Sequence, residues 1–408
     1  MKKILGALIM CTLFSCSVTA ENPFKFEDSK YEMMIKSTLV DSGNNFRLKK
    51  CIEKIKKGEK VYIAAIGGSV TEGAGPKDFK DGYAYQFFNA VKKVYSPKNS
   101  NNVFFDNAGL SGTPSLLGKL RYESDVVQVL GHIPDILIIE FAVNDGGEEV
   151  FKRSFEALVR DALLASPQTA VIALYSAATY GNTAEQKKPV ANYYDIPQID
   201  IMPVVNDAVN NNIFAKEDFY SDYVHPTKQG HTLMSDSLMY LLKIVDEAKA
   251  DSAVEVPQKP LIQKSLGGLI RILDDDKNVK ISKGSFNTVD NDCQTLKKTG
   301  KSDFPVNWHK KQNSASCEPF KMEIKCKSLV FTYKVQGSWM NEKFGKAQVY
   351  VDGKLVNTFD GAKKDGWNNC EVIMIIDESE SKNHKVEVKM LPSAEKLGFT
   401  IVAMGYTE

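Results

Sequence analysis

The sequence predicts a doubly wound α/β domain built on a parallel sheet, followed by an all-β sandwich domain. Within residues 60–247, short apolar runs rich in Val, Ile and Phe alternate with amphipathic stretches, which is typical of a parallel sheet covered by helices on both faces. Beyond residue 262 the hydrophobic period changes to two, as expected of strands that bury one face. The chain also has 408 residues, too many for one typical core.

The elements expected in the α/β domain follow from these runs. Buried strands are predicted at residues 61–66, 103–107, 136–141 and 170–175, and helices near residues 83–94, 114–129, 149–165, 201–211 and 227–248. Ser69, Gly112 and Asn144 each come just after a predicted strand or at the start of the next helix. Ligands bind beyond the carboxyl ends of the strands in such sheets, so we expect these residues to converge.

The remaining segments are assigned from composition and period. Residues 21–59 form an N-terminal lead-in, residues 60–248 the α/β domain, and residues 249–262 a linker. Residues 263–408 are predicted to form the β-sandwich, with a hairpin over residues 347–356. Asp352-Gly353 supplies the two positive φ angles that a type I′ hairpin turn requires.

The first twenty residues have the pattern of an export signal. A charged start precedes an apolar stretch at residues 4–14 that is too short to cross a bilayer. Two processing outcomes stay open: a lipobox-like sequence before Cys16 would leave a lipid anchor at that cysteine, whereas the residues up to Ala20 suit ordinary signal peptidase. Both predict an exported protein, which would be periplasmic, an outer-surface lipoprotein or secreted.

Charge and metal-binding patterns narrow the function classes. The formal net charge is +1 and no basic stripe with interleaved aromatics occurs, which argues against a nucleic-acid partner. No C-x-x-C pair occurs and His132, His309 and His384 lack partners at metal spacing, so we expect neither metal nor organic cofactor. The C-terminal cysteines could pair as disulfides or stay free thiols; they are Cys293, Cys317, Cys326 and Cys370.

Three residues supply the groups that nucleophilic ester chemistry needs. Ser69 follows the first predicted strand in Ile-Gly-Gly-Ser-Val-Thr, and Asp222 and His225 stand three apart near the end of the same domain. A serine after Gly-Gly is by itself often a turn residue, and Asp-x-x-His before Pro226 could be a helix cap. A serine hydroxyl needs a base, and the base needs an orienting group, and the chain offers one candidate for each role.

Four blocks in order extend this pattern to a resemblance with a known family. They are Gly68-Ser69-Val-Thr, Asn107-Ala-Gly-Leu-Ser-Gly112, Ala142-Val-Asn144-Asp145 and Asp222-Tyr-Val-His225-Pro. Together they resemble the SGNH (GDSL-type) hydrolases over about residues 60–247.

This resemblance implies a flavodoxin-like sheet and a set of roles. Ser69 would be the nucleophile, His225 its general base and Asp222 the residue that orients the imidazole. The oxyanion hole would consist of the backbone N–H groups of Ser69 and Gly112 and the side-chain amide of Asn144.

Two departures from the usual family pattern point to a subset. Gly68 replaces an Asp and Ala142 replaces a Gly, as in members that read Gly-Gly-Ser-x-Thr, many of which resemble polysaccharide acetylesterases. Arg121 and Glu140 also fit this subset. The motifs assign no chemistry to either residue: a structural salt bridge is the favoured interpretation for both, with substrate binding as the alternative.

The sequence therefore predicts an exported serine esterase that removes small acyl groups, above all acetyl, from acetylated polysaccharide or oligosaccharide through an acyl-enzyme. A lipolytic acylhydrolase or thioesterase is an alternative, as is a non-catalytic surface glycan-binding protein. In the β domain, Trp308, Trp339 and Trp367 could stack on sugar or fill the core. All four blocks precede residue 248, so we expect the chemistry to be separable from the β domain.

Overall fold

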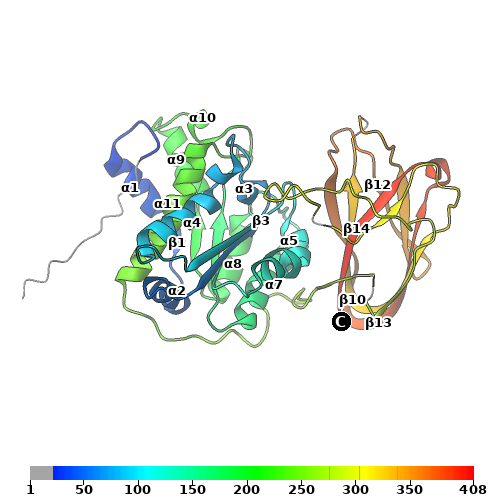
Figure 1. Cartoon of the computed structure of the whole chain (residues 1–408), viewed down its shortest axis with the longest axis horizontal. Coiled ribbons are helices and arrows are strands. Elements are labelled where there is room, and N and C mark those ends of the chain that lie inside the picture. The colour runs from blue at the N-terminus through cyan, green and yellow to red at the C-terminus, as the bar shows by residue number, and fades with distance from the viewer. Residues whose placement is uncertain (1–21, 275, 303, 338) are drawn as a thin grey trace, which may run out of the picture.

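The computed structural model describes residues 22–274, 276–302, 304–337 and 339–408. An α/β domain and a β domain lie side by side along the long axis of the molecule (Figure 1). The export signal and the lipid anchor at Cys16 fall outside the described residues. Within the described ranges, no helix is long and apolar enough to cross a membrane.

The α/β domain is built on a six-stranded sheet. Its order is β1 (Leu39–Asp41), β6 (Gln198–Asp200), β5 (Ala170–Tyr175), β4 (Ile136–Glu140), β2 (Val61–Gly67) and β3 (Val103–Gly109). β1 pairs antiparallel with β6, and the other pairs are parallel. Counted along the chain, the parallel strands run 2-1-3-4-5, which is the flavodoxin-like order. The predicted fold class is confirmed, with an added antiparallel edge strand.

Helices cover both faces of this sheet. They are α1 (Asp28–Ser37), α2 (Phe46–Lys56), α3 (Ser69–Glu72), α4 (Tyr83–Tyr95), α5 (Ser115–Tyr122), α6 (Gln128–Leu130), α7 (Glu149–Ala165), α8 (Ala184–Tyr193), α9 (Met202–Asn210), α10 (Lys216–Phe219) and α11 (Lys228–Glu247). Successive side chains of a strand point to opposite faces. Ile63 and Ala65 of β2 therefore join one apolar core with α1, α2, α4 and α11, whereas Ala64 and Ile66 join a second with α7 and α8.

The single helix predicted near residues 114–129 is interrupted. A π-helical turn, Glu123–Val127, separates α5 from α6. The polar lead-in also forms two helices, and α8 and β6 lie in a region where no element was predicted.

The β domain is all-β, as predicted, and its strands pair antiparallel. Its strands are β7 (Ile270–Arg271), β8 (Val279–Ser282), β9 (Trp308–Lys310), β10 (Phe320–Val335), β11 (Lys346–Val351), β12 (Lys354–Asp360), β13 (Asn369–Met390) and β14 (Phe399–Thr407). The predicted hairpin joins β11 to β12, with φ of 51° at Asp352 and 78° at Gly353.

The second half of β10 shows how the two domains meet. Its first half alternates buried and exposed residues, but from Leu329 onward every residue is buried. Leu329 and Phe331 face the core of the β domain, and Val330 packs on the other face in a cluster with Leu117 and Leu120 of α5. One face of the β-sheet is therefore covered by the α/β domain.

The segment between the domains is also held in place. Glu156 on α7 accepts hydrogen bonds from the backbone N–H groups of Leu261 and Ile262, at 2.5 and 2.9 Å. Arg160 donates to the carbonyls of Pro257 and Gln258. Residues 249–262 thus connect the domains as a linker that is packed against α7.

In the part of the chain described, Cys51, Cys293, Cys317 and Cys326 are free thiols.

Candidate active site

Ser69 stands at the junction between β2 and the short helix α3, close to Asn144. A Cβ on Gly68 would lie 2.1 Å from Oδ1 of Asn144, and a Cβ on Gly67 would lie 2.1 Å from Oγ1 of Thr71. Only glycines allow this close approach. The unusual Gly68 thus has a structural reason, because it lets the Asn144 amide pack directly beside the candidate nucleophile.

The three residues predicted to form a triad lie in hydrogen-bonding order. The hydroxyl of Ser69 lies 2.9 Å from Nε2 of His225, and Nδ1 of His225 lies 2.7 Å from Oδ2 of Asp222. The Ser69 residue is 6% exposed, whereas the His225 and Asp222 side chains are 25% and 44% exposed. The imidazole is therefore open to solvent or substrate while the serine lies below it.

Hydrogen bonds to the Asp222 carboxylate favour its ionised form. Partial burial acts to raise its pKa, but hydrogen bonds from the His225 side chain and from the N–H groups of His225 and Val224 outweigh burial and lower the pKa. Those two N–H groups both donate to Oδ1 at 2.8 Å, which leaves Oδ2 for the imidazole. This arrangement fixes the tautomer in which Nε2 can accept the serine proton.

His231, six residues beyond His225 and on α11, is a core residue rather than a ligand. It is fully buried, accepts from the N–H of Tyr83 at 3.1 Å and lies 3.0 Å from the carbonyl of Ala74. Burial lowers its pKa to about 4, so it stays neutral. It connects α4 and α11 to the loop that follows Ser69.

The two other candidate oxyanion donors are tied to each other. Gly112 has φ of 68°, a left-handed conformation suited to glycine. Oδ1 of Asp145 accepts from the N–H of Ser115 at 2.7 Å, so the residue after Asn144 holds the loop after Gly112. Asp145 in turn pairs with Lys187 at 2.9 Å, and both are buried. Lys187 was missed in the sequence because it lies on the unpredicted helix α8.

The side-chain oxygen of Asn144 is not used by the fold: its Oδ1 is buried without a hydrogen-bond partner among the described residues. An oxyanion would accept from the NH₂ group of this amide, not from Oδ1. On β3, Asn107 donates to the carbonyl of Thr71 at 2.7 Å and accepts from the N–H of Gly109 at 2.9 Å. Asn107 thereby joins the nucleophile helix α3 to the end of β3.

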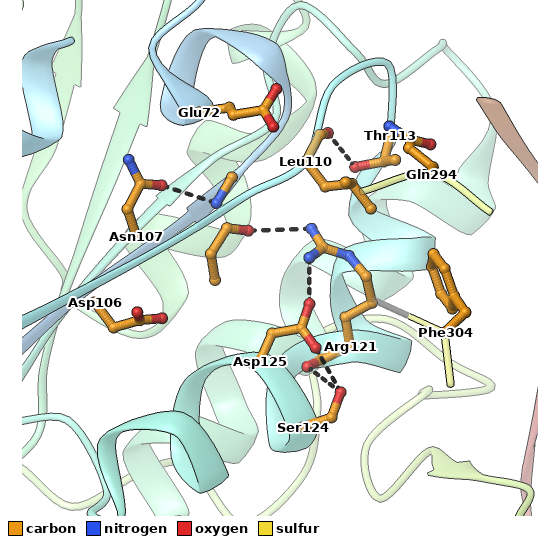
Figure 2. A network of polar contacts seen from close by, with 12 residues as sticks. Glu72, Asp106, Asn107, Leu110, Thr113, Arg121, Ser124, Asp125, Gln294 and Phe304 are labelled. Atoms are coloured by element: carbon orange, nitrogen blue, oxygen red, sulfur yellow. Dashed lines mark hydrogen bonds and ion pairs between the residues drawn. The ribbon is translucent and has the colours of Figure 1, made fainter. Parts of the chain in front are cut away.

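Arg121 and Glu140 do not face a substrate. Arg121 is fully buried, pairs with Asp125 and donates to the carbonyl of Ala108 at 3.1 Å, so it supports the end of β3 from within (Figure 2). Glu140 is also fully buried, and its carboxylate accepts from the Thr71 hydroxyl at 3.3 Å. Burial raises the pKa of Glu140 to about 7. Both side chains are fully buried, which disfavours substrate binding, and Arg121 forms the structural salt bridge that the sequence favoured.

The β domain contributes residues that sequence reasoning did not place at the site. A Cβ on Gly112 would lie 3.2 Å from the indole of Trp367, which is 44% exposed. Trp339 is 68% exposed, and only Trp308 is a buried core residue. Trp308 therefore fills the core, Trp339 and Trp367 stay exposed, and Trp367 lies beside Gly112 of the candidate oxyanion hole.

No group of His, Cys, Asp or Glu side chains in the described ranges is arranged to hold a metal ion. What the described side chains offer instead is a serine, a base, an orienting carboxylate and nearby amide donors, which is a set for acyl transfer.

Comparison with known proteins identifies the family of the α/β domain. Residues 65–233, which include every one of these groups on the α/β domain, match the model of the GDSL-like Lipase/Acylhydrolase family. The α/β domain therefore belongs to this family of ester hydrolases, as the sequence motifs predicted. Comparison with curated protein sequences gave no significant match.

Solved structures resemble the whole two-domain chain. A two-domain esterase (CEX) active on acetylated mannans is 25% identical, with a TM-score of 0.78 over 92% of this chain and 99% of that chain. A structure of a two-domain esterase (CEX) active on acetylated mannans, co-crystallised with mannopentaose, is 24% identical with the same TM-score of 0.78 and covers 94% of this chain and 99% of that one. The arrangement of an α/β hydrolase domain with an all-β domain is thus shared.

Proposed function

We propose that this protein is a serine esterase that removes acetyl groups from carbohydrate. The observation that carries the proposal is the hydrogen-bonded series Asp222, His225 and Ser69, at 2.7 and 2.9 Å, beside Gly112 and Asn144. It lies beyond the carboxyl ends of β2 and β4, between which the sheet order reverses and where ligands bind in doubly wound sheets.

The geometry supports a two-step mechanism. His225 Nε2 takes the proton of Ser69 as Oγ attacks the acyl carbon, and Asp222 stabilises the imidazolium that forms. The negative oxygen of the tetrahedral intermediate would accept from the N–H groups of Ser69 and Gly112 and from the Asn144 amide. His225 then protonates the departing sugar hydroxyl. Water activated by the same imidazole attacks the acyl-enzyme and releases acetate.

Two observations support carbohydrate as the alcohol part of the ester. The half-exposed indole of Trp367 next to Gly112 offers a flat apolar surface with an N–H handle, which suits the face of a sugar ring. The similar two-domain esterase is described as active on acetylated mannans. Export, with either release or an anchor at Cys16, would bring the enzyme to such polymers.

Acyl-chain selectivity tests this proposal. We expect kcat/KM to be highest for acetyl esters and to fall for acyl groups of eight or more carbons. Chromogenic esters of increasing chain length and acetate release from a panel of acetylated polysaccharides measure this. If kcat/KM instead rises with chain length, the protein is a lipolytic acylhydrolase. If no ester is cleaved, the glycan-binding alternative gains.

Replacing Asn144 with alanine should lower kcat by about 10²–10³-fold with little change in KM. The reason is that its amide would meet a charge that exists only in the transition state. Steady-state kinetics on an acetyl ester measure the effect, and Asn211→Ala, at an exposed asparagine after α9, serves as the matched control. A change confined to KM would mean that Asn144 only binds substrate.

A further inference from the structure

The β domain reaches the candidate oxyanion hole through one side chain, Gln294. The segment between β8 and β9 extends from the β domain toward α3 and β3, and Gln294 lies beside Thr113 at the turn after β3 (Figures 1 and 2). Its Nε2 donates to the carbonyl oxygen of Ser111 at 2.6 Å. That carbonyl belongs to the same peptide group as the N–H of Gly112.

This contact fixes the direction of the Gly112 N–H. The structure contains no cis peptide bond among its described residues, and in a planar trans peptide the N–H points opposite to the C=O. Because Gly112 lacks a Cβ and adopts a φ of 68°, its own backbone does little to restrain rotation of this peptide group. A donor that holds the Ser111 oxygen therefore holds the Gly112 hydrogen as well.

Gln294 itself is fixed at both ends of its amide. The residue is 6% exposed, and its Oε1 accepts from the N–H of Cys370 on β13 at 3.1 Å. If the amide turned over, its oxygen would face the Ser111 carbonyl and its NH₂ would face an N–H donor. The amide therefore has one acceptable orientation, and it is set by the β-sheet.

A second contact from the same segment holds the other side of this turn. The backbone N–H of Lys297 lies 3.2 Å from Oε1 of Glu72, whose other oxygen accepts from the hydroxyl of Ser111. Glu72 is the last residue of α3, which begins at Ser69. The β domain thus contacts both elements that would supply backbone oxyanion donors.

We propose that Gln294 is a positioning residue for catalysis, which orients and polarises the Ser111–Gly112 peptide so that the Gly112 N–H meets the oxyanion. A hydrogen bond to a carbonyl strengthens the N–H of the same peptide group as a donor, because bonds in series polarise one another. The proposal rests on the esterase function proposed above, and it makes the β domain a part of the oxyanion hole.

Two substitutions separate this role from a structural one. Gln294→Glu keeps an oxygen for the Cys370 N–H but places a carboxylate against the Ser111 carbonyl, whereas Gln294→Met keeps the volume and loses both bonds. We expect both to lower kcat on an acetyl ester by about 10–100-fold, with Glu at least as damaging as Met and KM within about threefold, a smaller loss than removal of a whole donor. If Gln294 only anchors β13, Gln294→Glu will keep wild-type kcat, and that result overturns the proposal.

The control breaks a domain contact that does not involve the turn. Arg153 on α7 makes two bonds to Asp377 in the β domain, at 2.9 and 3.1 Å. Asp377→Asn should keep wild-type kcat. An equal loss of kcat in Asp377→Asn would show that any weakening of the interface slows the enzyme and would also overturn the proposal.

A measurement without substrate tests the role of Gln294 independently of the proposed esterase function. In protein labelled with ¹⁵N-glycine, the Gly112 amide resonance should shift in both Gln294 variants and stay in place in Asp377→Asn, because it senses the bond to the preceding carbonyl. An unchanged Gly112 resonance overturns the inference even if the enzyme is active. A wild-type protein without any esterase activity overturns the proposed function, while the resonance still tests the positioning.

Discussion

Replacing Ser69 with alanine is expected to lower kcat on an acetyl ester by at least about 10³-fold while the protein stays folded. The substitution removes the atom that would form the acyl-enzyme, and the remaining triad members cannot compensate because they act as a unit. The side chain is nearly buried, but within the described residues its hydroxyl forms a hydrogen bond with His225 alone. Its loss should therefore cost little stability.

Kinetics and covalent labelling measure this result together. A phosphonate probe that reacts with nucleophilic serines should label the wild type once, at Ser69, and leave Ser69→Ala unlabelled. Ser237→Ala is the matched control, since Ser237 is also buried and its hydroxyl donates to the carbonyl of Leu233 on its own helix. A folded Ser69→Ala protein with most of the wild-type turnover would remove Ser69 from the mechanism.

The residues of the candidate site could be predicted because topology brings them together. Ser69, Gly112 and Asn144 follow three parallel strands, and strand ends on one edge of a sheet must converge. Asp222 and His225 are close in sequence, so their hydrogen bond needs only a local turn. Each of these signals is contained in a short block of the chain.

The contacts between the two domains could not be predicted from any short block of the sequence. Trp367 and Gln294 stand in ordinary β-domain sequence, and their positions beside Gly112 depend on how the two domains pack against each other. Arg121 is a different case. Its partner Asp125 lies four residues further on, so the i,i+4 spacing in a predicted helix could have indicated the ion pair that makes it structural.

The domain interface also changes what truncation should do. The sequence predicts that the chemistry is separable from the β domain, because every catalytic block precedes Ala248. The structure shows that α5 packs its leucines against β10 and β14: Leu117 is fully buried, Leu120 is 3% exposed, and a Cβ on Gly405 would lie 2.2 Å from Leu120. Removing the β domain would expose this face.

We therefore expect a chain that ends at Ala250 to be less stable and to lose most of its activity even on a small chromogenic acetate. Exposing two leucines costs about 3–6 kcal/mol, out of a typical total stability of about 5–15 kcal/mol. The same truncation removes Gln294 and Lys297, so the turn at Gly112 loses its outer contacts.

Thermal unfolding and small-ester kinetics on the truncated and full-length proteins separate the two causes. The expected result is a lower Tm together with a kcat, corrected for the folded fraction, that falls at least as far as in Gln294→Glu. A truncated protein that is folded and keeps the full-length kcat on the small ester, yet is slow on acetylated polymer, would show that the β domain acts only by holding glycan near the site through effective concentration. Because α5 and the turn at Gly112 are adjacent in sequence, we expect loss of stability and loss of kcat to occur together.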